Sequence, residues 1–116
     1  MKLIVGALAV VLLAGCASMS ERRAEGPLAV FSSKKDVAAA SECVLYAWQN
    51  QSLAGVHYDV FTQPLPNGGR TVVSAGQIDF FDFKSTSNGS RVELYFQSGL
   101  MDWRKDRRTE AVKTCL

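Results

Sequence analysis

The pattern of apolar residues indicates an apolar N-terminal run, hereafter the leader segment, and two amphipathic helices further along the chain. An apolar run from Leu3 to Ala14 follows the single charge of Lys2. Apolar residues then recur every three or four positions over residues 34–50, which predicts an amphipathic helix. A second helix is predicted over about residues 100–114. The residues expected to face inward from this last helix are Trp103, Val112 and Cys115.

Four segments between these helices have the pattern of strands. They alternate apolar and polar residues or concentrate β-branched and aromatic ones, and they cover residues 56–62, 70–75, 77–84 and 91–97. Turn formers separate them, including Asn88-Gly89 in the last hairpin. The order α-β-β-β-β-α requires no parallel crossover. We therefore predict an α+β fold, a small two-layer domain with a four-stranded antiparallel meander and two helices on one face.

Strand alternation also predicts which aromatic side chains are exposed. Only alternate residues of a strand face the same way, so placing Phe80 beneath the helices turns Phe81 and Phe83 outward. The same argument gathers four aromatics on an uncovered sheet face, which is a candidate interaction surface: Phe61, Phe81, Phe83 and Tyr95. A bulge near Phe80, or coverage of that face by the segment around Val30-Phe31, would instead make these residues part of a core.

The composition indicates an ordinary folded domain. The chain has 116 residues, of which 47% are hydrophobic and 21% are charged. Residues 16–116 keep 12 of the 13 Lys and Arg residues, since only Lys2 precedes them, against 11 Asp and Glu residues. This near-neutral balance lacks the basic character that a nucleic-acid partner requires, so none is expected. A basic cluster on the last helix is a solvated face, or a contact for an acidic partner or for the phosphates of lipid A: Arg104, Lys105, Arg107 and Arg108.

The leader segment ends in Leu13-Ala14-Gly15-Cys16, which resembles the lipobox of bacterial lipoproteins. The run of 12 apolar residues has the length of a signal-peptide core, whereas a transmembrane helix needs about 20. In that family the cysteine is lipidated and becomes the first residue of the mature protein. The alternative is an ordinary secretory signal that a cysteine follows by chance.

The resemblance implies three segments and a location. These are a signal peptide over residues 1–15, a lipidated Cys16 with a tether over residues 16–32, and a single α+β domain over residues 33–116. The membrane would hold the protein through the lipid on Cys16. In the family's sorting pattern an Asp after the cysteine favours the inner membrane, so Ala17 implies the outer membrane of a Gram-negative host, on its periplasmic face.

Lipidation of Cys16 would leave Cys43 and Cys115 as a pair. The periplasm is oxidising, so we predict a disulfide between them where the two helices touch. The bond would close a loop of 72 residues and stabilise the domain by roughly 4 kcal/mol in the chain-entropy model.

The remaining residues do not predict catalysis. His57 is the single histidine, a metal site normally needs several converging ligands, and no Gly-x-Ser-x-Gly motif is present. Asp79 and Asp82 are spaced to lie on opposite faces of a strand. We therefore expect no enzyme activity, metal or cofactor.

The sequence favours a small outer-membrane lipoprotein that acts as a non-catalytic binding or envelope-interaction module with an unknown protein or envelope partner. The alternatives are a structural or exclusion-type surface lipoprotein without a specific ligand, and a small periplasmic hydrolase.

Overall fold

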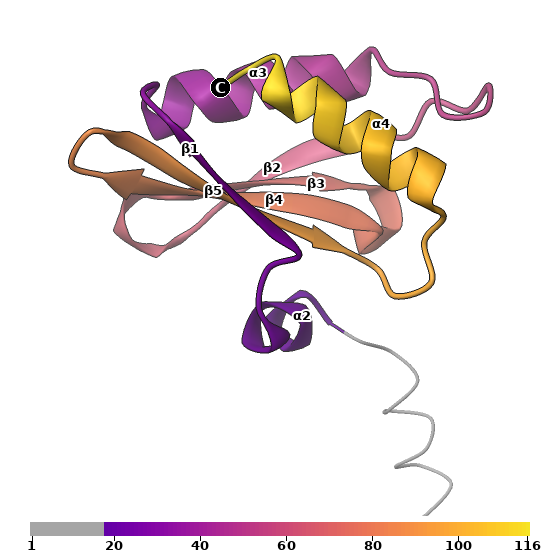
Figure 1. Cartoon of the computed structure of the whole chain (residues 1–116), viewed down its shortest axis with the longest axis horizontal. Coiled ribbons are helices and arrows are strands. Elements are labelled where there is room, and N and C mark those ends of the chain that lie inside the picture. Colours follow the sequence, from indigo (N-terminus) through magenta and orange to yellow (C-terminus); the bar gives the residue numbers. More distant parts are fainter. Residues whose placement is uncertain (1–17) are drawn as a thin grey trace, which may run out of the picture.

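Residues 18–116, the part of the chain that this computed structural model describes, form three α-helices and five antiparallel strands. In chain order the elements are α2 (Met19–Glu25), β1 (Ala29–Ser33), α3 (Val37–Gln49), β2 (Val60–Pro64), the 3₁₀ turn η1 (Pro66–Gly68), β3 (Arg70–Ser74), the 3₁₀ turn η2 (Ala75–Gln77), β4 (Asp79–Thr86), β5 (Gly89–Phe96) and α4 (Asp102–Lys113). The strands form one sheet in the order β1-β5-β4-β3-β2. Helices α3 and α4 cover one face of this sheet, and α2 lies against the other (Figure 1).

The predicted α+β class is confirmed, but the four-stranded, two-helix layout is wrong in detail. The described segment of the expected tether contains a helix and a strand, and β1 pairs antiparallel with β5 at the edge of the sheet. The register sets Phe31 opposite Val92, and both pack toward α3 and α4. This five-residue strand is stabilised by its pairing with β5, and its own sequence has no pattern that predicts a strand. The lipobox and Cys16 lie outside the described residues.

The other four strands form the predicted meander with shifted boundaries. Strand β2 begins at Val60 rather than at residue 56, because Leu53 and Val56 pair across a tight turn and occupy the chain before it. The turn includes Gly55, whose φ of 81° suits glycine. His57 consequently lies in an exposed loop and not in a strand.

The main core lies between the sheet and the helices α3 and α4. Asp36 caps the N-terminus of helix α3, and its carboxylate accepts a hydrogen bond from the Ala39 amide at 2.8 Å. Its apolar stripe meets the sheet at Trp48, whose ring stands edge-to-face on Phe81 at 5.4 Å. Phe83 packs beside Phe81 in the same core.

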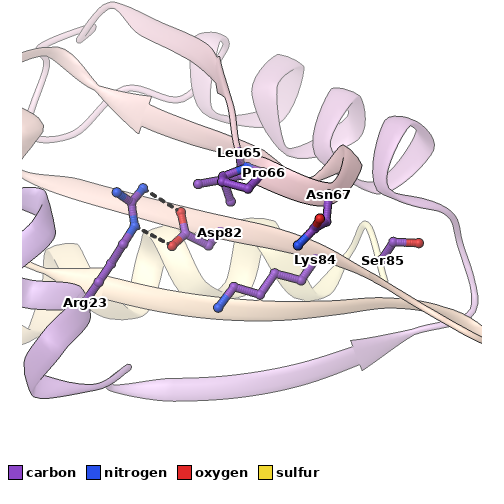
Figure 2. Close-up of a pocket in the computed structure, with 7 residues that line it drawn as sticks. All are labelled: Arg23, Leu65, Pro66, Asn67, Asp82, Lys84 and Ser85. Atoms are coloured by element: carbon purple, nitrogen blue, oxygen red, sulfur yellow. Dashed lines mark hydrogen bonds and ion pairs between the residues drawn. The ribbon is translucent and has the colours of Figure 1, made fainter.

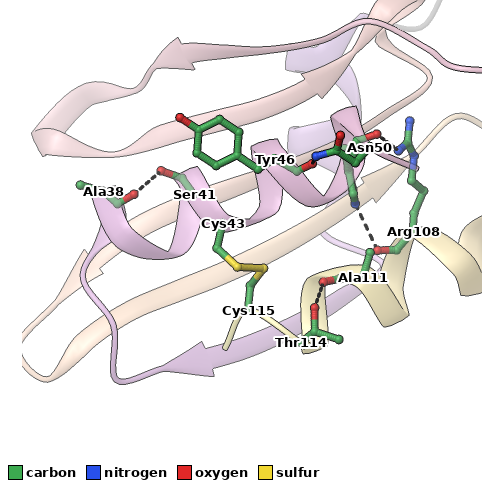
Figure 3. Close-up of a disulfide and its surroundings, with 10 residues drawn as sticks. Ala38, Ser41, Cys43, Tyr46, Asn50, Arg108, Ala111, Thr114 and Cys115 are labelled. Atoms are coloured by element: carbon green, nitrogen blue, oxygen red, sulfur yellow. Dashed lines mark hydrogen bonds between the residues drawn. A yellow bond between two sulfur atoms is a disulfide. The ribbon is translucent and has the colours of Figure 1, made fainter. Parts of the chain in front are cut away.

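A disulfide joins Cys43 of α3 to Cys115 just beyond α4 (Figure 3). The Cα atoms lie 5.7 Å apart, so the expected pairing is present in the structure. The Trp48 indole also donates a hydrogen bond to the Arg108 carbonyl at 3.2 Å. The expectation that Trp103 faces inward is wrong, since its side chain is 43% exposed. The buried stripe of α4 instead runs through Arg104, Arg108 and Val112.

Candidate functional site

The face of the sheet opposite α3 and α4, hereafter the α2 face, corrects the predicted aromatic surface. Cross-strand pairing aligns Phe61, Val73, Phe80 and Tyr95 on this face. Of the four predicted aromatics, only Phe61 is exposed, at 52%. Phe81 and Phe83 are buried in the main core, and Tyr95 is buried under α2. The candidate surface therefore does not exist as predicted.

The error is a shift of one residue in the phase of β4. The chain turns sharply at η2, where Gly76 and Gln77 have φ of 75° and 58°. Ile78 has helical backbone angles, so the strand begins only at Asp79. Because side chains alternate, this start turns Phe80 to the α2 face and Phe81 to the main core.

Helix α2 covers this face by combining apolar and cationic contacts. Ser18 caps the helix by accepting the Glu21 amide at 3.1 Å. Met19 packs into a second small core with Val73 and the stacked rings of Phe80 and Tyr95. Burial raises the pKa of Tyr95, with a further contribution from nearby carboxylates.

Arg22 and Arg23 attach α2 to the sheet at two further points. The Arg22 guanidinium lies 4.9 Å from the centre of the Phe80 ring and donates hydrogen bonds to the carbonyls of Gln77 and Ile78. Arg23 donates two hydrogen bonds to the buried carboxylate of Asp82, from Nε at 2.7 Å and from Nη2 at 2.9 Å. The hydrogen bond with Asp82 is the main reason that the pKa of Arg23 is raised.

A surface hollow of about 500 Å³ opens beside the Arg23–Asp82 pair. Figure 2 shows Arg23 and Asp82 facing each other on one side, with the turn after β2 and the end of β4 completing the wall. Gly69 allows the turn to lie close to β4, since a Cβ there would stand 2.9 Å from the Phe83 carbonyl. The lining residues are Arg23, Leu65, Pro66, Asn67, Asp82, Lys84 and Ser85.

The charges around this hollow are balanced. Thr71 donates a hydrogen bond to Asp82 at 2.6 Å, so the carboxylate already has three protein donors. Lys84 and Arg91 flank the largely buried Glu93 and form ion pairs with it. Among the residues that line the hollow, Lys84 is the exposed cation. A ligand there would also meet Leu65 and Pro66 of the turn, with the Asp82 carboxylate already engaged.

A second hollow of about 460 Å³ lies beside the same helix. The chain leaving α2, including Leu28, forms one wall, and the end of β5 with Tyr95 forms another. The two hollows show that α2 covers only the middle of the sheet face.

The predicted basic cluster of α4 is not one surface. Arg104 and Arg108 are buried and bond to Asp79 of β4, at 3.1 and 3.4 Å between Nε and Oδ2. Lys105 is half-buried, and Arg107 is the one exposed member of the four. The helix turns two of the four cations inward because residues 104, 108 and 112 share a face. The predicted basic face is therefore wrong.

Asp79 is the centre of a buried cluster that sequence reasoning missed. Its carboxylate also accepts a hydrogen bond from the Ser74 hydroxyl. The Arg108 guanidinium lies 4.5 Å from the centre of the Trp48 ring, and burial is the main reason that the pKa of Arg108 is lowered. Only the four-residue spacing of Arg104, Arg108 and Val112 could have suggested that α4 buries two arginines.

The arrangement of the other candidate residues follows from these positions. Asp79 points toward α4 and Asp82 toward α2, so the two carboxylates lie on opposite faces as predicted. Within residues 18–116, no group of three or more His, Cys, Asp and Glu side chains is placed to hold a metal ion. None of the helices in that range combines the length and apolar character needed to cross a bilayer.

No family model, curated protein or solved structure matches the chain.

Proposed function

We propose that this chain is a small bacterial lipoprotein, anchored in the outer membrane through Cys16, whose domain acts as a non-catalytic envelope-interaction module. The observation that carries the proposal is the lipobox-like sequence Leu13-Ala14-Gly15-Cys16 at the end of a 12-residue apolar run. Every element that the structure describes follows Cys16, starting with α2 at Met19 and its cap at Ser18. Cleavage before Cys16 would therefore leave every described contact intact.

The positions of the two buried carboxylates support a non-catalytic role. A general acid or base must reach a substrate. Asp79 is fully buried between Arg104 and Arg108, and Asp82 is held by Arg23 and Thr71. Both carboxylates are engaged in structural ion pairs, on opposite sides of the sheet. Such an arrangement stabilises the fold and leaves neither group available for proton transfer.

The α2 face offers the surface for the interaction. It carries the hollow lined by Arg23 and Lys84, and the exposed ring of Phe61 stands on the neighbouring edge strand. Ligand sites are usually concave with a few polar groups, and aromatic side chains are enriched at protein interfaces. A domain of this kind would meet its partner at the hollow.

Metabolic labelling with palmitate tests the anchor. The wild-type chain should incorporate label, whereas Cys16→Ser should lose it and accumulate as the uncleaved precursor. Ala17→Asp is the matched control: it keeps the cysteine, so it should be labelled normally but move to the inner-membrane fraction. Equal labelling of the wild type and Cys16→Ser would refute lipid anchoring.

Photo-crosslinking in intact envelopes tests the interaction module. A photoreactive residue at Lys84 should give a defined product, because this side chain lines the hollow. The same residue at Lys113, exposed on α4, should give none. If neither position yields a product, the structural or exclusion-type alternative is favoured.

A further inference from the structure

Seven large apolar side chains are exposed in residues 18–116, and three of them lie on the α2 face. The other four lie on α3, in the loop before β2 and at the start of α4. Phe61 projects from the edge strand β2, and Val30 projects from the opposite edge strand β1, where it pairs with Glu93. They are 52% and 43% exposed. Leu28, 64% exposed, lines the second hollow beside Tyr95. These residues stand on both sides of α2, so together they span the width of the sheet.

The position of the chain end restricts what can cover this face. Ser18, where the described chain begins, caps α2 and therefore lies on the α2 side of the sheet (Figure 1). Cys16 is two residues earlier, and an extended chain covers at most about 3.3–3.6 Å per residue. A lipid on Cys16 would hold the start of α2 within about 7 Å of the bilayer surface. The sheet then separates α3 and α4 from that surface.

We propose that the α2 face lies on the membrane, with Phe61, Val30 and Leu28 inserted at the level of the lipid headgroups. This inference rests on the proposed anchoring at Cys16 and names the lipid surface as the partner of the α2 face. Apolar side chains at an interface enter the boundary between headgroups and acyl chains to about 5–10 Å. The anchor supplies the affinity, and the three side chains fix the orientation of the domain.

The charges on this face predict how docking depends on lipid composition. Charges of both signs are equal in number on α2 and on the strand positions that face it. The four cations are Arg22, Arg23, Lys84 and Arg91, and the four carboxylates are those of Glu21, Glu25, Asp82 and Glu93. The net attraction of this face to anionic lipid is therefore small. Docking should therefore be similar on zwitterionic and anionic vesicles and insensitive to salt.

Depth-dependent fluorescence quenching tests this orientation with the lipidated full chain in vesicles. Single cysteines replacing Phe61 or Val30 would carry an environment-sensitive NBD label, with the Cys43–Cys115 disulfide left oxidised. Tyr46→Cys is the matched control, because Tyr46 is 54% exposed on α3, across the sheet from α2. Quenching by spin-labelled lipids should be at least about twice as strong at positions 61 and 30 as at position 46, as expected for side chains within the interface.

The outcomes separate this inference from the proposed function. Mass spectrometry of the purified chain establishes lipidation at Cys16 independently of the label. If the chain is lipidated and all three positions are quenched equally, the orientation is overturned while the anchor stands. Protection of position 61 in intact envelopes but not in protein-free vesicles would assign the α2 face to a protein partner, which also overturns the inference.

Discussion

Replacing Asp79 by Asn removes the carboxylate that compensates two buried guanidinium groups. Arg104 and Arg108 both direct Nε toward one oxygen of Asp79. Within the described residues, the Nη2 atoms of both arginines are buried without a hydrogen-bond acceptor. The asparagine would keep the shape and could still accept the Ser74 hydroxyl, but it would leave two uncompensated cations against each other.

The expected loss of stability in Asp79→Asn is large because Asp79 and both of its arginine partners are buried. Breaking a buried ion pair by removing one partner costs about 3–5 kcal/mol. Asp82→Asn is the matched control on the other face of the same strand. Asp82 is equally buried, but its partner Arg23 is 30% exposed and can be rehydrated. The loss there should be nearer the ~1.5–3 kcal/mol expected for a hydrogen bond to a charged group.

Urea unfolding at neutral pH measures both variants. A domain of this size has about 5–15 kcal/mol of stability, so a loss of ~4 kcal/mol is readily measured. The double variant Asp79→Asn/Arg108→Met should be less destabilised than the sum of the single changes, by about 0.5–3 kcal/mol, because it removes a stranded charge. A cost for Asp79→Asn below about 1 kcal/mol, or exact additivity of the double variant, would refute the buried-cluster argument.

Three further predictions test the core, the disulfide and the pH dependence. Phe81→Ala should cost about 3–5 kcal/mol in urea unfolding, whereas Phe61→Ala should stay within about 0.5 kcal/mol; similar losses would refute the corrected strand phase. Replacing Cys43 and Cys115 together by Ser should lower stability by roughly 4 kcal/mol, and an unchanged unfolding midpoint would contradict this. The raised pKa of Tyr95 means that its neutral phenol favours the folded state, so stability is fully present below about pH 10 and declines as pH rises through the folded pKa. Tyr95→Phe should remove that part of the alkaline decline, and an identical pH profile in the variant would count against it.

Local sequence signals were reliable where burial followed a simple period. The apolar stripe of five residues predicts α3 and its inward face. Four of its members are buried and Ala47 is partly buried; the other four are Val37, Ala40, Val44 and Trp48. The pairing of Cys43 with Cys115 followed from cysteine count and compartment, and the structure contains it. The prediction that Asp79 and Asp82 lie on opposite faces is confirmed, because side chains three residues apart in a regular strand point in opposite directions.

The sequence predicts the wrong side-chain position where a residue's environment depends on distant parts of the chain. The predicted face of Phe81 and Phe83 is wrong because the start of β4 depends on the backbone angles of Gly76 and Gln77, and a one-residue shift reverses the direction of every side chain in the strand. Arg104 and Arg108 looked like a solvated surface, since arginine is rarely buried without a partner. Their partner Asp79 is 25 and 29 residues away along the chain, so local spacing could not reveal it.

The sequence alone determined the α+β class, the main helix and the cysteine pair, because helical periodicity and covalent parity are properties of short segments or of counts. Two features depend on tertiary contacts alone: the fifth strand of the sheet, and the covering of its second face by α2. Strand β1 exists because β5 pairs with it, and α2 packs because Met19, Arg22 and Arg23 find Phe80, Tyr95 and Asp82 beneath them. Those partners lie more than 50 residues away along the chain. Stabilisation by such distant contacts does not require a periodic pattern of apolar residues within β1 or α2, so the sequence of these segments does not predict them.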